Sequence, residues 1–131
     1  MQRKFDLIKH YLREINISIV KEIPEQEIVV VEDEENGIKN LVIDCEEPIV
    51  ILEQAIMQVP NQPDDLFKKL LQMNRKLVHG AFVLDENERI ILFRDTLQLE
   101  NIDRNELESS IQALSLALTE FGSTLLMYVN K

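Results

Sequence analysis

Two short segments hold the residue types that most often carry chemistry in proteins. Leu77-Val78-His79-Gly80 places one of only two histidines beside one of only three glycines. A histidine can act as a general acid or base, but a His-Gly pair also occurs where a helix ends. Cys45-Glu46-Glu47 holds the only cysteine, which could act as a nucleophile.

Neither segment has the neighbours that such chemistry requires. Negative side chains raise a thiol pKa, so Glu46 and Glu47 disfavour the reactive thiolate and favour a structural role for Cys45. His10 and His79 have no ligand partner at metal-binding spacing, and the glycines stand too far apart for a phosphate loop. Carboxylates are plentiful, but no spacing singles out an acid–base pair. We therefore predict no catalytic residues, no metal and no cofactor.

An acidic run, Glu32-Asp33-Glu34-Glu35, could suggest a calcium loop. In the EF-hand pattern a glycine follows the first aspartate by five positions, whereas Gly37 follows Asp33 by four. The chain then enters a run of strand-forming residues. These features favour a solvated turn.

The net charge of −10 is concentrated in one part of the chain. Residues 22–53 contain eleven acidic residues and one basic residue, Lys39, which accounts for the whole net charge. Such a chain is repelled by nucleic acids and by anionic membranes, so neither is an expected partner. The acidic segment could be a solvated sheet face that maintains solubility, or a surface that steers basic partners.

The cysteine count and the hydropathy pattern indicate the compartment. One cysteine excludes an internal disulfide and is typical of a reducing compartment. Charges interrupt residues 1–14, so no secretory signal is predicted, and no apolar run approaches the roughly 20 residues of a membrane helix. We expect a soluble cytoplasmic protein.

Three helices are expected from apolar spacing and capping residues. Residues 3–14 place Phe5, Ile8 and Leu12 on one stripe. A second helix is predicted over 64–79, with Pro63 near its first turn, a buried Asn74 that bonds to nearby backbone, and His79 in its last turn. Gly80 would then take a left-handed conformation. A third helix begins at a capping box formed by Asp103 and Glu106, and Gly122 is a natural residue to end it.

Five strands are expected, at 28–31, 38–45, 49–59, 80–85 and 89–99. Asn36-Gly37 predicts a type I′ hairpin between the first two. Residues 15–27 are expected to be mostly irregular, although alternating isoleucines allow a short strand. The order α-β-β-β-α-β-β-α predicts a single α+β domain over 1–131, with one antiparallel sheet and its helices mainly on one face.

Three segments carry a resemblance to a known family. They are Leu70-Leu71-Gln72-Met73-Asn74, Gly80-Ala81-Phe82-Val83-Leu84-Asp85 and Ile90-Ile91-Leu92-Phe93. With the predicted order of elements, the chain resembles the type III secretion chaperone fold of the Tir-chaperone family and the related YbjN family. The resemblance implies a non-enzymatic homodimer that binds an extended segment of a client or regulatory protein.

The resemblance also implies where partners would bind. The expected client contacts are Phe5, Ile8, Leu12, Ile49 and Ile51. The expected dimer contacts are Phe67, Leu71, Leu92 and Arg94. The alternative function is a small-molecule binder or an enzyme with a pocket near His79 and Asn74.

Overall fold

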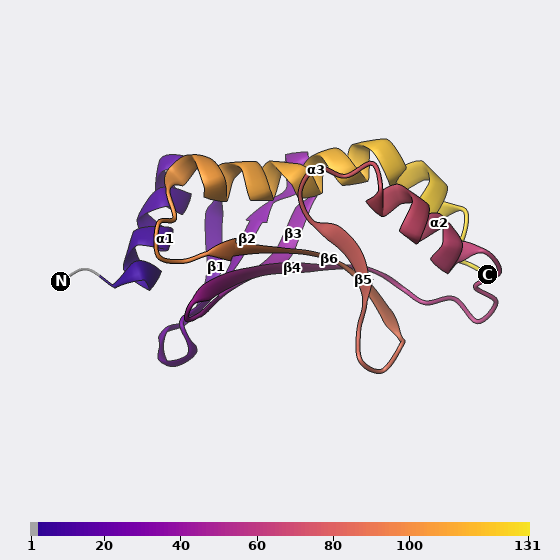
Figure 1. The fold of residues 1–131 in the computed structure, drawn as a ribbon, viewed down its shortest axis with the longest axis horizontal. Coiled ribbons are helices and arrows are strands. Elements are labelled where there is room, and N and C mark those ends of the chain that lie inside the picture. The colour runs from indigo at the N-terminus through magenta and orange to yellow at the C-terminus, as the bar shows by residue number, and fades with distance from the viewer. Residues whose placement is uncertain (1–2) are drawn as a thin grey trace.

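The computed structural model describes residues 3–131, which form one six-stranded antiparallel sheet with three α-helices on one of its faces (Figure 1). In chain order the elements are α1 (Lys4–Glu14), β1 (Ser18–Ile23), η1 (Pro24–Gln26), β2 (Ile28–Asp33), η2 (Glu34–Asn36), β3 (Ile38–Glu46), β4 (Ile49–Gln58), α2 (Leu66–Asn74), β5 (Ala81–Leu84), β6 (Ile90–Gln98) and α3 (Arg104–Leu126). The strand order across the sheet is β1-β2-β3-β4-β6-β5. The predicted α+β class and the one-sided helix packing are confirmed.

Helix α1 is held against the sheet by the apolar stripe that its spacing predicts. Phe5, Ile8 and Leu12 are buried, because positions three and four apart lie on one helical face. Lys9 bridges α1 to β1 through an ion pair with Glu22 at 3.3 Å. The first helix therefore covers the β1 end of the sheet.

The strands alternate between a covered and an uncovered face. Val29 and Val31 of β2 are fully buried under the helices, whereas Val30 between them is only half-buried. The same alternation places Ile43 in the core and Asp44 on the other face. We call the face opposite the helices the open face.

The sequence prediction lacked one strand. The structure has four strands before α2 instead of three, because Ser18–Ile23 forms β1 where mostly irregular chain was expected. The register shifts between Ile19 and Lys21, so Val20 is an extra residue in a β-bulge. The bulge interrupts the alternation that would have marked the strand.

The β2–β3 hairpin was predicted correctly, but the predicted turn type was wrong. Residues Glu34–Asn36 form a 3₁₀ turn, and among residues 34–37 only Gly37 has a positive φ, of 76°. A type I′ turn requires two consecutive residues with positive φ. The longer turn follows the shift in register between Val31 and Asp33.

Helix α2 is shorter than predicted at both ends. It begins at Leu66, after Asp64 adopts a positive φ of 51°, so Pro63 does not lie in its first turn. It ends at Asn74, so His79 lies beyond the helix and is exposed. The predicted position of His79 at the negative end of a helix dipole was therefore wrong. Gly80 has the predicted left-handed conformation, with φ of 75°.

Helix α3 begins as predicted but continues past its expected end. The Glu106 amide donates to the Asp103 carboxylate at 2.7 Å, which confirms the cap. Gly122 does not terminate the helix, because the buried stripe continues through Phe121 to Leu125. The tail packs on the core: Tyr128 is buried, and its hydroxyl donates to Asp65 at 2.6 Å.

Candidate functional site

The two edges of the sheet differ in whether they can accept another strand. Strand β5 forms one edge and β1 the other. At the β5 edge, the side-chain Nδ2 of Asn74 donates to the Phe82 backbone carbonyl at 3.0 Å, and the Phe82 backbone N–H donates to the side-chain Oδ1 of Asn74 at 2.7 Å. The N–H and C=O of one residue point to the same side of an antiparallel strand, so Asn74 occupies the outer hydrogen-bonding groups of Phe82. The prediction that Asn74 bonds to nearby backbone is confirmed, and this edge is closed at its centre.

The β1 edge carries a broad hollow. Arg13, Ile17 and residues 18–22 line this hollow, which we call the β1 hollow and which has a volume of about 650 Å³. Val20, the residue at the bulge, leaves half of its surface exposed. The β1 edge is therefore accessible along most of its length.

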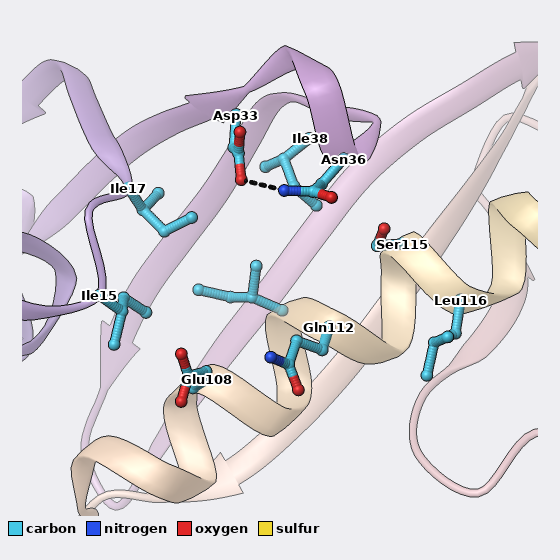
Figure 2. Close-up of a pocket in the computed structure, with 10 residues that line it drawn as sticks. Ile15, Ile17, Asp33, Asn36, Ile38, Glu108, Gln112, Ser115 and Leu116 are labelled. Atoms are coloured by element: carbon cyan, nitrogen blue, oxygen red, sulfur yellow. Dashed lines mark hydrogen bonds between the residues drawn. The ribbon is translucent and has the colours of Figure 1, made fainter.

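A second cavity lies beside the start of β1 (Figure 2). We call it the isoleucine pocket, because Ile15, Ile17, Ile38 and Ile111 line it; its volume is about 280 Å³. Ile17 also lines the β1 hollow, so the two depressions adjoin.

The rim of the isoleucine pocket is polar. Its side chains come from the η2 region and from α3: Asp33, Asn36, Glu108, Gln112 and Ser115. Asn36 donates to the Asp33 carboxylate at 2.6 Å, which orients both side chains on the η2 side (Figure 2). An apolar side chain fits such a cavity, with polar groups at its mouth to fix the orientation of a ligand.

Gln54 of β4 holds the η2 turn in place. This side chain is buried; its carbonyl accepts from the Lys39 N–H at 3.0 Å and its amide donates to the Gly37 carbonyl at 3.0 Å. Gly37 also packs closely on α3, since a Cβ there would lie 3.1 Å from Leu118. Sequence reasoning missed Gln54. The available signal was its position two residues after the inward-facing Leu52, where an apolar residue is expected.

Cys45 is unsuited to nucleophilic chemistry. It is buried on β3, and burial, followed by the nearby charges of Glu27 and Asp44, raises the pKa of its thiol to about 12. The thiol therefore stays protonated at neutral pH, as the structural interpretation predicted.

The structure does not bring His79 and Asn74 together in one cavity. His79 lines two cavities beside α3, of about 250 and 330 Å³, and Asn74 lines neither. In the first cavity the Ser110 hydroxyl donates to Asp95 at 2.7 Å, so a carboxylate and not the imidazole is its acceptor. Within residues 3–131, no group of three or more His, Cys, Asp or Glu side chains could hold a metal ion. In the same part of the chain, no helix is both long and apolar enough to cross a membrane.

The expected protein contacts fall in three different places. Phe5, Ile8 and Leu12 are at most 1% exposed, so they pack the core and do not form a client-facing surface. The residues Ile49, Ile51, Leu92 and Arg94 lie on the open face, each of them half-buried. Phe67 and Leu71 are 39% and 73% exposed on α2.

Asp44 lies on the open face between two isoleucines, Ile28 on β2 and Ile51 on β4. One of its carboxylate oxygens is buried, and no hydrogen-bond partner for it is present among the described residues. Burial raises the pKa of Asp44 above its usual value of 3.8, and the nearby charges of Glu46 and Glu53 raise it further. The charged form of Asp44 is therefore destabilised in the folded chain.

We expect Asp44→Asn to raise the urea midpoint of unfolding at neutral pH. A carboxyl whose folded pKa is raised stabilises the fold below its unfolded pKa and loses that contribution as pH rises through the folded pKa. The difference in urea midpoint between Asp44→Asn and the parent should thus shrink as the pH is lowered toward 3.8. The exposed Glu34→Gln is the control and should stay within about 0.5 kcal/mol of the parent. An unchanged or lowered midpoint for Asp44→Asn at neutral pH would contradict this account.

Solved structures of other proteins share this fold. The chain is similar in structure to YbjN from E. coli, with a TM-score of 0.71, 14% identity and coverage of 92% of each chain. It is also similar to the Yersinia pestis type III secretion chaperone SycH, in a complex with a stable fragment of YscM2, with a TM-score of 0.64, 14% identity and coverage of 89% of this chain and 98% of that one.

A third similar structure is the HopA1–SchA chaperone–effector complex, with a TM-score of 0.61, 13% identity and coverage of 82% of this chain and 84% of that one. The sequence matches no curated protein. The CesT_Tir_1 family model matches residues 1–131. The chain therefore belongs to the CesT_Tir_1 family of type III chaperones.

Proposed function

We propose that this protein is a chaperone-like binding protein that holds an extended client segment along β1, with an apolar client side chain in the isoleucine pocket. The observation that carries the proposal is the difference between the two edges. The β1 edge adjoins a hollow and a pocket, whereas Asn74 closes β5 at Phe82. A binding role without catalysis agrees with the membership of a chaperone family.

If the client pairs with β1 as an added strand, the β1 backbone would supply affinity and the isoleucine pocket would supply specificity. Hydrogen bonds from the β1 backbone would bind any extended segment, and the pocket would select its side chains. Because Ile17 lines both depressions, a segment paired with β1 passes the pocket. The carboxylates of Asp33 and Glu108 at the rim favour a client with a basic residue next to its apolar anchor.

Similar folds bind other proteins. SycH is seen with a fragment of YscM2, and SchA is seen in a chaperone–effector complex. These two complexes support a protein client for this chain as part of the proposal.

We also propose a homodimer that uses Phe67, Leu71, Leu92 and Arg94. Phe67 and Leu71 expose apolar surface on α2. Phe67 and Leu71 lie on α2, outside the acidic segment 22–53, so two copies can approach through α2 with less repulsion than at β2 or β3. The cytoplasm is the proposed compartment, where the free thiol of Cys45 stays reduced.

The test uses peptides selected from a random phage-displayed library on the wild-type protein. Val20→Pro removes a backbone donor at the bulge, where proline is tolerated, and Ser115→Phe fills the isoleucine pocket from α3. We expect each change to weaken the binding of the selected peptides by about tenfold or more, which corresponds to about 1.4 kcal/mol. Fluorescence anisotropy with labelled peptides gives the Kd.

Thr119→Phe is the matched control, because it adds the same ring to an exposed position of α3 outside the pocket lining. It should leave the Kd within about twofold. Hydrogen exchange should show protection of β1 amides when peptide is bound. Selected peptides that bind Val20→Pro and Ser115→Phe as tightly as wild type, with no protection of β1, would disprove the edge-binding model.

A further inference from the structure

The open face of the sheet combines apolar rows with unbalanced negative charge. Cross-strand pairing aligns Ile28, Asp44 and Ile51 in one row, and Val42 and Glu53 in the next. Glu46 lies on the same face of β3, two residues beyond Asp44. We call these six residues the acidic face patch. The three α-helices formed by residues 3–131 lie on the opposite face of the sheet, so none of them covers the patch (Figure 1).

The charges in the acidic face patch have little compensation. Glu53 has a long ion pair with Arg94, at 3.9 Å. Asp44 has a buried oxygen without a partner in the described part of the chain. Half-buried isoleucines flank its carboxylate on both neighbouring strands. A desolvated carboxylate in this setting would be stabilised by a cation delivered from outside.

We propose that the acidic face patch is a docking surface for a cationic amphipathic helix of a partner protein. The apolar stripe of the helix would lie on the isoleucines, and its lysines or arginines would reach Asp44, Glu46 and Glu53. This proposal does not depend on client binding at β1.

The backbone hydrogen bonding of the sheet favours a helix as the partner of this patch. Strands β2, β3 and β4 are paired on both sides, so their backbone groups are already used in the ladders. The open face of the sheet can contact a partner only through side chains. A partner bound there must therefore satisfy its backbone hydrogen bonds within itself. A helix does so within itself, whereas an extended segment needs a free sheet edge.

The charge of the patch determines which helix can bind. A second copy of this chain that used the same surface would bring two sets of three carboxylates together, which is unfavourable. A helix with lysine or arginine beside an apolar stripe supplies both the missing cations and the missing cover. The acidic segment 22–53 would also speed the encounter with such a partner.

The probe is a labelled synthetic peptide of about 14 residues, roughly four helical turns, with leucines on one face and lysines beside them. Fluorescence anisotropy measures its Kd for the full chain at low and at high salt. A second peptide replaces every lysine with glutamate, and a third permutes the same composition so that no apolar stripe forms. We expect binding of the first peptide alone, and weaker binding at high salt.

Two double variants locate the binding surface. Asp44→Asn with Glu46→Gln removes two charges from the patch, and Glu34→Gln with Glu35→Gln removes two from the exposed η2 turn. The first pair should weaken binding by about tenfold or more, and the second by no more than about twofold. Val20→Pro should leave this Kd unchanged, so the result is separate from the test of the β1 edge.

Several outcomes would overturn the proposal. They are equal loss of binding in the two double variants, equal binding of the permuted peptide, loss of binding in Val20→Pro, or no binding of the lysine peptide. Circular dichroism of each variant verifies that it is folded.

Discussion

Replacing Gly80 with alanine is expected to lower the free energy of unfolding by about 2–5 kcal/mol. Gly80 has a φ of 75°, a conformation that strains any residue with a Cβ. The added Cβ would also lie 2.3 Å from Cζ and 2.6 Å from Cε1 of the Phe93 ring. That ring is buried and packs edge-on against Phe82 at 5.8 Å, so it has little freedom to move away.

The matched control is Gly122→Ala. Gly122 lies inside α3, and a Cβ built there has no atom within 4 Å. Alanine should therefore stabilise the helix by about 0.5–1 kcal/mol. Urea unfolding of both variants measures the two effects, which should have opposite signs. A Gly80→Ala protein as stable as Gly122→Ala would refute the close packing of Phe93 on Gly80.

Asn74→Ala is expected to destabilise the fold by about 2–4 kcal/mol, because it removes both partners of the Phe82 backbone at once. Without Asn74 the outer groups of Phe82 can also pair with another molecule, so we expect a stronger tendency to associate. Urea unfolding and light scattering measure the two consequences. Gln72→Ala, at an exposed position of α2, is the control.

Asn74→Asp separates the two hydrogen bonds. An ionised aspartate can accept from the Phe82 N–H but cannot donate to the Phe82 carbonyl, whereas a protonated one can do both. The stability of this variant relative to the parent should therefore recover as the pH is lowered. Stability losses in Asn74→Ala no larger than in Gln72→Ala would show that the bonds to Phe82 contribute little.

Local sequence signals predicted the elements whose interactions are local. The stripe of α1 and the Asp103 cap of α3 are defined within a few residues, and both were found correctly. The end of α2 was predicted wrongly, because Leu77 and Val78 continue an apolar pattern although the helix stops at Asn74. There the Asn74 side chain bonds to Phe82, eight residues further along the chain, and Val78 is 89% exposed. Periodicity contains no information about such a contact.

The candidate site was less predictable than the fold. The isoleucine pocket brings together Ile17, Ile38 and Ile111, which are distant in sequence and each of which is an ordinary core residue by itself. Apolar spacing also identified the stripe Phe5, Ile8 and Leu12, but a stripe that faces a core and one that faces a partner have the same pattern. Only the long-range packing of α1 on the sheet distinguishes these cases.

The unequal edges of the sheet limit how copies of this protein can assemble. A sheet with two free edges can add units at both sides and grow without end, as in fibrils. Asn74 occupies Phe82 on β5, which leaves β1 as the edge that can pair. Edge pairing then has a valence of one: two copies joined through β1 form a closed pair with no further site of this kind. A client on β1 and a second copy on β1 would compete for the same backbone, so client binding and edge-to-edge association exclude each other.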